Sequence, residues 1–234
     1  MRSSAIGSIL AVAVLGSASV ALAVENGQWQ ALENDANCKI WNDNSQRGNK
    51  VTWSGPCENG KAERQGVAVR RYFENGQWKE SRFEGELEGG KAQGRGTWTG
   101  PNGDQYEGDW ADGLRDGQGI TLFSNGDRFE GSHQEGEFDG LGTYIWSDGD
   151  RYLGDFKVNQ MHGYGVYIYS DGGIYVGEWI EGTKNGQGKR TWADGSQFEG
   201  KIVAGNPHGD GKCRSAAGEL GVCRYAYGEF MGWQ

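Results

Sequence analysis

The sequence predicts an all-β fold: an elongated single sheet in which 23-residue β-hairpins follow one another as an antiparallel meander, with a disulfide-stapled cap at each end. Composition is the first observation behind this prediction. Of 234 residues, 43 are glycine, three are proline and 12% are aromatic. An interior glycine costs a helix about 1 kcal/mol relative to alanine, and disordered chains contain few aromatic residues. The second observation is that aromatic and glycine positions recur every 23 residues, which is typical of a repeat array.

The charge balance narrows the class of partner. The chain has 23 Lys and Arg against 32 Asp and Glu, a formal net charge of −9. Nucleic acids and anionic lipid headgroups are bound mainly through clustered basic residues, whereas the basic pairs Arg70-Arg71 and Lys189-Arg190 stand alone. We therefore expect no nucleic-acid partner, and we expect any membrane association to work without a basic patch.

The first 23 residues are interpreted as a signal peptide. Arg2 precedes an apolar run over residues 5–20, and Ala21-Leu22-Ala23 has the small-residue pattern of a cleavage site. A membrane anchor is the alternative, but the run is shorter than the roughly 20 residues that a spanning helix needs. The prediction is an exported chain, periplasmic or secreted, cleaved near Ala23. Export also allows disulfides to form.

Residues 24–52 are assigned to an N-terminal cap and residues 53–82 to a degenerate hairpin. Trp53 and Gly66 imitate the opening of a repeat, but the spacing from Trp53 to Phe83 is 30 residues instead of 23. The sequence Glu-Asn-Gly-Gln-Trp at 74–78 is a strong turn signal. We therefore expect the extra residues to lengthen this hairpin.

Six repeats are assigned, at 83–105, 106–128, 129–151, 152–174, 175–197 and 198–220. In each repeat, glycine occupies the second, eleventh, thirteenth and twentieth positions after the opening aromatic residue. The seventh position is glycine in five repeats and Asn159 in the other. Because Asn is the residue other than glycine that best tolerates positive φ, this position is predicted to lie in a left-handed turn. The opening aromatic residues are Phe83, Tyr106, Phe129, Tyr152, Tyr175 and Phe198.

Each repeat is predicted to form a hairpin with two different faces. In the second repeat we expect a first strand over 106–110, a turn over 111–116 and a second strand over 117–123, because polar and apolar residues alternate in both strands. The opening aromatic residue, the glycine after it and the residue four positions on share one face. We expect rings on this face to cover the glycines and to stack in a ladder. The opposite face carries Ile120, Leu122 and their equivalents.

The last assigned segment, residues 221–234, is a C-terminal cap. Four cysteines allow three connectivities, and the sequence alone cannot choose among them. Proximity favours Cys38–Cys57 and Cys213–Cys223, each of which would staple one end of the array. Free thiols and metal ligation are the alternatives.

The spacing Tyr106-x-Gly108-x-Trp110-x-x-Gly113-x-x-x-Gly117-x-Gly119 resembles the MORN (membrane occupation and recognition nexus) repeat. The resemblance covers residues 83–220 and, in degenerate form, the hairpin from Trp53. Departures are His133 and Ile202 at the Trp position and Asn159 at a glycine position. The resemblance implies a curved meander that serves as a scaffold, a dimerisation surface, a membrane-associated module or an appendage to a catalytic domain. With its leader, the chain resembles an exported, bacterial-type member.

No catalytic, cofactor-binding or metal-binding residues are predicted, and the chain is predicted not to be an enzyme. His162 and His208 occupy one repeat position and His133 replaces a Trp-type residue, so structural roles are favoured for all three. Carboxylates such as Glu107 alternate outward along strands and are interpreted as a solvated face. The cluster Asp148-Gly149-Asp150 lacks the full ligand series of a calcium loop and is interpreted as a hairpin turn.

The leading functional hypothesis is an exported, non-enzymatic scaffold that binds a protein or a second copy of itself in the cell envelope. A glycan or cell-wall binder that uses stacked rings is the second hypothesis, and a membrane-associated adaptor is the third. If one face of the sheet stays open, its rings form a gutter for such a partner. The candidate residues are Tyr106, Trp110, Tyr152, Phe156, Tyr175 and Trp179.

Overall fold

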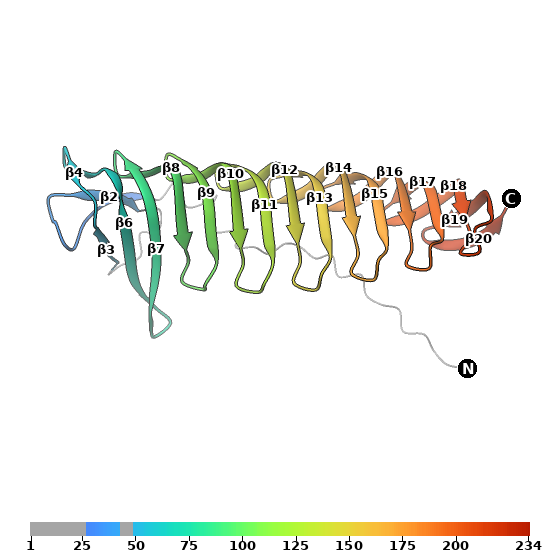
Figure 1. Cartoon of the computed structure of the whole chain (residues 1–234), viewed down its shortest axis with the longest axis horizontal. Helices are drawn as coiled ribbons and strands as arrows, with labels where there is room; N and C mark the ends of the chain where they lie inside the picture. Colours follow the sequence, from blue (N-terminus) through green and yellow to red (C-terminus); the bar gives the residue numbers. More distant parts are fainter. Residues whose placement is uncertain (1–26, 43–48) are drawn as a thin grey trace.

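A computed structural model describes residues 27–42 and 49–234. Regular structure in these residues is entirely β: a sheet of 16 strands, and a sheet of four strands at its N-terminal end (Figure 1). From β6 onward, each strand of the long sheet pairs antiparallel with the strand next in sequence. The predicted all-β meander is therefore confirmed. The predicted signal peptide lies outside the described residues, and the residues that are described contain no helix that could cross a membrane.

The N-terminal part contains the small sheet and an extended hairpin. The small sheet pairs β1 (Gln28–Ala31), β2 (Lys39–Asn42), β5 (Lys61–Ala62) and β4 (Cys57–Glu58) in that order. The long sheet begins with β3 (Lys50–Trp53), β6 (Arg64–Glu74) and β7 (Gln77–Glu88). The tip of the β6–β7 hairpin projects beyond the row of strands (Figure 1). Its turn is at Asn75-Gly76, so the expected lengthening of this hairpin is present.

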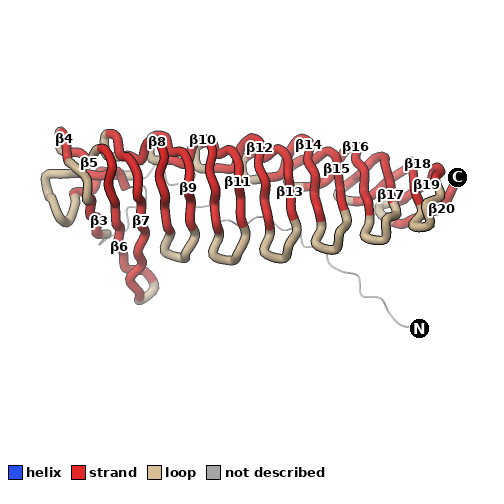
Figure 2. The backbone as a smooth tube through the Cα atoms, viewed as in Figure 1, coloured by secondary structure: helices blue, strands red, loops and turns tan. Residues whose placement is uncertain are grey.

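The remaining strands form regular hairpins, joined along one edge of the sheet by short loops (Figure 2). In chain order they are β8 (Lys91–Thr99), β9 (Gln105–Ala111), β10 (Leu114–Leu122), β11 (Arg128–Gln134), β12 (Glu137–Ile145), β13 (Arg151–Lys157), β14 (Gln160–Ile168), β15 (Ile174–Ile180), β16 (Thr183–Thr191), β17 (Gln197–Val203), β18 (Asn206–Arg214), β19 (Leu220–Ala226) and β20 (Glu229–Trp233).

The turn within each hairpin is shorter than predicted. Asp112 and Gly113 both have positive φ, 51° and 91°, and the flanking Ala111 and Leu114 already pair across the hairpin. Two consecutive residues with positive φ are typical of the two-residue type I′ turn, whose twist matches that of the strands. The expected turn over 111–116 was therefore too long. Asn159 has a φ of 62°, as predicted for its position, and Val158 before it also has positive φ, at 47°.

A row of glycines crosses the long sheet. Gly108 pairs with Gly119 within its hairpin, and Gly119 pairs with Gly131 of the next repeat. The opening ring of each repeat lies over this row, as predicted: a Cβ added to Gly188 would stand 2.6 Å from the ring of Tyr175. A side chain at these positions would therefore displace the ring. The row contains Gly66, Gly85, Gly96, Gly108, Gly119, Gly131, Gly142, Gly154, Gly165, Gly177, Gly188, Gly200 and Gly211.

Rings on the same face form the predicted ladder. Phe156 lies edge-on between Phe129 and Tyr152, with both centroid distances 5.1 Å. Trp179 repeats this arrangement between Tyr152 and Tyr175, at 5.1 and 5.5 Å. Edge-to-face pairs contribute about 0.5–1.5 kcal/mol each beyond the area they bury. Because each ring at the Trp position touches the opening rings of two repeats, the ladder couples the hairpins from Phe83 to Tyr175, and buried Ile202 takes this position in the sixth repeat.

Carboxylates in the loops add a second connection between repeats. Asp127 accepts hydrogen bonds from the Ser147 amide and the Tyr144 hydroxyl of the next repeat, both at 2.8 Å. Asp150 does the same with the Ser170 amide and the Tyr167 hydroxyl, at 2.8 and 2.5 Å. These bonds hold the pKa of both carboxyl groups below its usual value, against the opposing effect of burial.

Both ends of the array carry a disulfide, with the connectivity that proximity favoured: Cys38–Cys57 and Cys213–Cys223. The C-terminal segment is itself a further hairpin. Tyr225 takes the Trp position, 5.1 Å from the ring of Phe198, and Gly228 takes the turn position, with a φ of 92°. The long sheet therefore continues through the predicted cap.

Candidate functional site

The six residues predicted to line an open gutter have a packing role in the structure. Tyr152 is 0% exposed, Trp179 is 2% and Phe156 is 5%, and Trp110 is half-buried. These rings do not form an open gutter. Tyr106, Tyr152 and Tyr175 lie over the glycine row, and Trp110, Phe156 and Trp179 stand edge-on against the opening rings of adjacent hairpins. The remaining residues of the set, Tyr106 and Tyr175, are each 1% exposed. These side chains leave almost no surface for a partner.

A second row of rings on the aromatic face retains exposed surface. Trp146 lies 4.6 Å from Tyr144, and Tyr169 lies 4.6 Å from Tyr167. The members of this row are half-buried against the core and stand at the 23-residue spacing: Phe123, Trp146, Tyr169 and Trp192. This row, and not the opening rings, is what the aromatic face can present to a ligand.

Lys184 occupies a cage of aromatic rings on this face. Its ammonium lies 4.7 Å from the ring centroids of both Tyr167 and Tyr169 and 5.2 Å from that of Trp179. It also hydrogen-bonds the Tyr169 hydroxyl. Burial lowers the pKa of Lys184 to about 8, and the nearby Arg190 adds to the effect. Sequence reasoning missed this residue because its repeat position carries a different side chain in every repeat, so no periodic signal marks it.

His133 is buried in the ring ladder, where its Nδ1 lies 3.2 Å from the Gly131 carbonyl oxygen and its Nε2 lies 3.4 Å from the Thr121 hydroxyl. Its ring lies 5.0 Å from Tyr106 and 5.2 Å from Phe129. Burial lowers the pKa of His133 to about 4, and the Arg115 guanidinium contributes in the same direction. The neutral imidazole therefore takes the place of a Trp-type ring.

The described residues contain one group of side chains with metal-ligand spacing, namely Asp35 with Cys38 and Cys57. Both sulfurs belong to a disulfide, whereas metal ligation by cysteine needs the thiolate. This group therefore does not fit a metal ion. In the Asp148–Asp150 cluster, Asp148 accepts the Asp150 amide at 3.1 Å, as expected for a turn.

The opposite face of the sheet carries an apolar patch that no described element covers. Leu153 pairs with Thr143 and Val166 across the strands, and Val166 pairs with Val176. Leu122, Leu153 and Ile174 are 42%, 44% and 37% exposed. We call this patch the apolar strip; it consists of Ile120, Leu122, Ile145, Leu153, Val166, Ile168, Ile174 and Val176.

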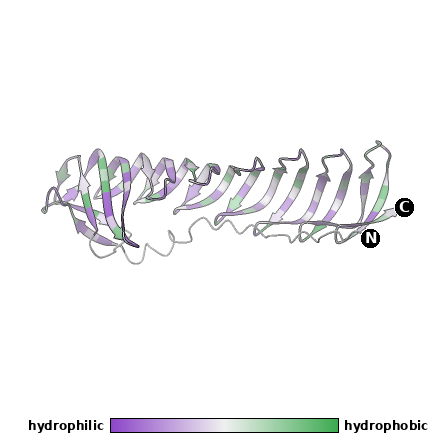
Figure 3. Cartoon of the chain, turned by 90° about the horizontal axis from the view of Figure 1, so that it is seen from below, coloured by the Kyte–Doolittle hydropathy of each residue, from purple (hydrophilic) through white to green (hydrophobic). Residues whose placement is uncertain are grey.

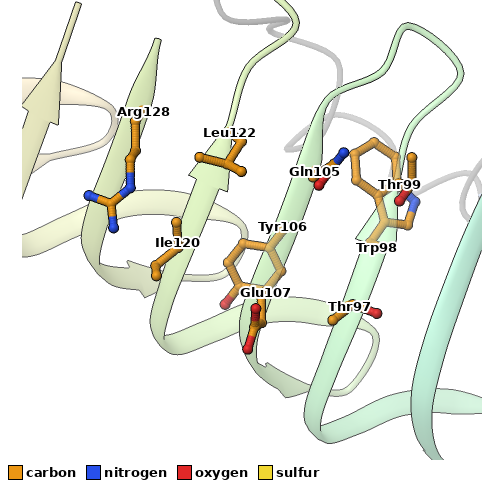
Figure 4. Close-up of a pocket in the computed structure, with 9 residues that line it drawn as sticks. All are labelled: Thr97, Trp98, Thr99, Gln105, Tyr106, Glu107, Ile120, Leu122 and Arg128. Atoms are coloured by element: carbon orange, nitrogen blue, oxygen red, sulfur yellow. The ribbon is translucent and has the colours of Figure 1, made fainter. Parts of the chain in front are cut away.

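At its N-terminal end the apolar strip opens into a shallow hollow of about 260 Å³. Figure 4 shows Ile120 and Leu122 beside Glu107 and Arg128, with Thr97 on the far side. Along the strands, hydrophobic bands alternate with hydrophilic ones (Figure 3).

The fold thus defines a class of protein, an open-ended array of β-hairpins in a single long sheet. Comparison with known families identifies the particular one. The MORN repeat matches residues 83–105, 106–128, 129–151, 152–174, 175–197 and 198–219, more than half of the chain. The chain belongs to the MORN repeat family and is a MORN repeat β-sheet scaffold.

Searches for individual relatives add no closer assignment, and no curated protein matches the sequence. Solved structures with some similarity include the TCP domain of Drosophila melanogaster SAS-4 in complex with a proline-rich motif of Ana2, at 15% identity and a TM-score of 0.27, covering 55% of this chain and 83% of that one. Another is a mutant TCP10 domain of Danio rerio CPAP, at 14% identity and a TM-score of 0.22, covering 65% and 91%. At such TM-scores these likenesses carry no argument about function.

Proposed function

We propose that the chain is an exported, non-enzymatic scaffold that mediates protein–protein interaction or self-association in the cell envelope. The apolar strip supports this proposal most directly. Exposed contiguous apolar patches on soluble proteins mark interaction sites. On the aromatic face, by contrast, the buried rings are already used by contacts between repeats.

The titratable groups with shifted pKa values fit a structural role. His133 contacts rings of the ladder, and Asp127 and Asp150 bind the next repeat. A catalytic centre brings such groups together around a reacting atom, whereas Asp127 and Asp150 recur at the repeat spacing and His133 replaces a ring of the ladder.

The experiment that tests this function is crosslinking in native envelopes followed by mass spectrometry. We expect crosslinked peptides from the apolar strip to a protein, whether a different one or a second copy. Leu153→Lys should remove them, because it places a charge in the middle of the strip without disturbing a buried side chain. Val158→Lys is the matched control, since Val158 is 60% exposed and lies in a turn outside the strip. Unchanged crosslinks in Leu153→Lys would contradict the proposal.

Binding to a glycan is the second candidate, and the row of half-buried rings favours it. Phe123, Trp146, Tyr169 and Trp192 present ring surface at regular spacing, as stacking on sugar rings requires. We expect Trp146→Ala with Trp192→Ala to abolish retention on isolated cell wall if this function holds. Retention that survives both substitutions would exclude it.

A further inference from the structure

The two ends of the long sheet differ in how their outer edges are paired. β3, the strand at the N-terminal end, pairs with β6 on its inner side. On its outer side, the Val51 carbonyl oxygen accepts a hydrogen bond from the Glu33 amide at 2.7 Å. The Asn34 side chain binds both backbone groups of Trp53: it donates to the carbonyl oxygen at 2.8 Å and accepts from the amide at 3.3 Å. The N-terminal segment therefore closes this edge of the sheet.

β20, the strand at the C-terminal end, has no such cover in the part of the chain that the structure describes (Figure 1). The Gln234 amide donates to the Val222 carbonyl oxygen of β19. Because the backbone groups of successive residues in a strand point to opposite sides, the amide and carbonyl of Trp233 point away from β19. Natural proteins protect an open edge with lysine, proline or a covering segment, and β20 contains neither lysine nor proline. This edge is therefore available to a further strand.

The exposure of Phe230 on β20 shows what a further strand would bury. Phe138 stands at the same repeat position, four repeats earlier. Phe138 is 6% exposed, whereas Phe230 is 51% exposed. The strand of Phe138 is followed by β13, whose Phe156 ring lies 6.2 Å from the Phe138 ring. Phe230 contacts Tyr225 of β19 at 5.4 Å on its inner side, but no strand follows β20 among the described residues.

The repeats also show which kind of strand fits this edge. β12 carries a β-bulge against β11, yet β13 pairs with β12 without a shift from Gly140 to Ile145. β14 and β15 repeat this arrangement. β20 has the bulge of such a second strand, between its pairs with Arg224 and Tyr225, so a regular antiparallel strand would complete the pattern. The long sheet of a second copy offers no such strand, because its β20 is bulged, its β3 edge is closed and its other strands are paired on both sides.

We propose that the outer edge of β20 binds an extended segment of a different protein, which pairs antiparallel with β20 as one further strand of the long sheet and packs an apolar side chain against Phe230. In this mode of recognition, main-chain hydrogen bonds supply affinity and the alternate side chains supply specificity. The segment therefore has a ring or a branched apolar residue beside Phe230, a small residue opposite the large ring of Trp233, and no proline between them. This site lies on an edge of the sheet and does not depend on the apolar strip.

The test uses the full chain and a fluorescent peptide with the sequence of residues 150–158, which contains β13 and its Phe156. Fluorescence anisotropy should show saturable binding by the unaltered chain. Phe230→Lys should weaken binding about tenfold or more, because it replaces the apolar contact with a charge. Leu220→Lys is the matched control and should bind as the unaltered chain does, since Leu220 is 80% exposed in the same hairpin but lies on β19. A peptide with proline in place of Gly154 should not bind, because proline cannot donate to the sheet.

Hydrogen exchange of the Trp233 amide distinguishes strand pairing from ring contact alone. In NMR spectra of the full chain labelled with ¹⁵N-tryptophan, the peptide should slow exchange of this amide about tenfold or more, because the amide becomes hydrogen-bonded. No binding at about 1 mM peptide, equal binding by Phe230→Lys, or unchanged exchange at Trp233 would overturn the proposal. A dimer of the chain that Phe230→Lys dissociates would make a second copy the occupant and would also overturn it. Leu153→Lys should leave peptide binding unchanged, so failure of the apolar strip and failure of this site are distinguishable.

Discussion

Each opening ring packs over a pair of glycines, and a double-mutant cycle at Phe129 and Gly142 measures the coupling energy of this packing. Phe129 is fully buried, and a Cβ added to Gly142 would lie 2.6 Å from two atoms of its ring and 3.3 Å from Phe156. Gly142 is well suited because the nearest atoms are side chains rather than backbone. Its replacement by alanine therefore acts on the rings.

The magnitudes follow from burial and overpacking. Gly142→Ala overpacks the ladder and should lower the free energy of unfolding by about 1–3 kcal/mol. Phe129→Ala removes a buried ring and should cost about 3–5 kcal/mol. In the double variant the new methyl enters the space that the ring has left. We therefore expect the double variant to be about as stable as Phe129→Ala alone, with a coupling energy of about 1–3 kcal/mol.

The assay is equilibrium unfolding in urea, with intrinsic fluorescence and circular dichroism recorded together. Gly172→Ala is the matched control: Gly172 also belongs to the repeat pattern, with a φ of 90°, but a Cβ there has no neighbour within 4 Å. Its cost should be about 1 kcal/mol, from backbone strain alone, and should add to that of Phe129→Ala within about 0.5 kcal/mol. If the losses of unfolding free energy caused by Gly142→Ala and by Phe129→Ala simply add in the double variant, the idea that the ring packs over this glycine is refuted.

Three further predictions concern pH and the disulfides. The pKa of His133 is about 4 in the folded chain and near 6.5 in the unfolded chain. As the pH decreases from 6.5 to 4, the unfolded chain therefore binds a proton that the folded chain does not. The free energy of unfolding should fall over this range by up to about 3 kcal/mol. Urea titrations at pH 7, 5 and 4 should show this loss, and His133→Trp should reduce it; an equal loss in that variant would assign it to other groups. Burial raises the pKa of Tyr106 to about 12, so above pH 10 this tyrosine ionises first in the unfolded chain and the free energy of unfolding should fall. Absorbance at 295 nm, which reports tyrosine ionisation, should then rise together with unfolding. A gradual rise in this absorbance while the chain stays folded would contradict the prediction. Finally, Cys213→Ser should lower the free energy of unfolding by about 3 kcal/mol, the loop-closure value for a ten-residue separation; an unchanged midpoint in non-reducing urea titrations would show that this disulfide does not staple the end.

The periodic features of the fold could be predicted because the sequence repeats them. The glycine row, the opening rings and the left-handed turn position each recur six times, so their structural causes are visible in the sequence. The turn over 111–116 was overestimated because Asp112 is not glycine, although its φ is positive, and only backbone geometry reveals this. The C-terminal hairpin was missed because Gly221 stands where the opening aromatic residue is expected, even though Tyr225 and Gly228 keep their positions.

The candidate site was harder to predict, because alternation along a strand assigns residues to faces but does not tell which face is covered. Trp179 was expected on an open face, yet it lies between two rings of adjacent repeats. Leu153 was not singled out, because most repeats have an acidic residue at its position; its exposure becomes informative only beside Val166 and Val176. Lys184 had no periodic signal at all. Departures from the repeat are therefore where this chain differs from a generic array.

Small-angle X-ray scattering of the dilute monomer tests the central claim, that the hairpins pack side by side in one extended sheet. Sixteen strands at about 4.8 Å spacing give an array about 70 Å long, which corresponds to a radius of gyration of about 22–24 Å. A compact domain of this chain length would have a radius of gyration of about 17–18 Å. A value near 23 Å with a maximum dimension above about 70 Å agrees with the extended sheet, and a value near 17 Å would contradict it.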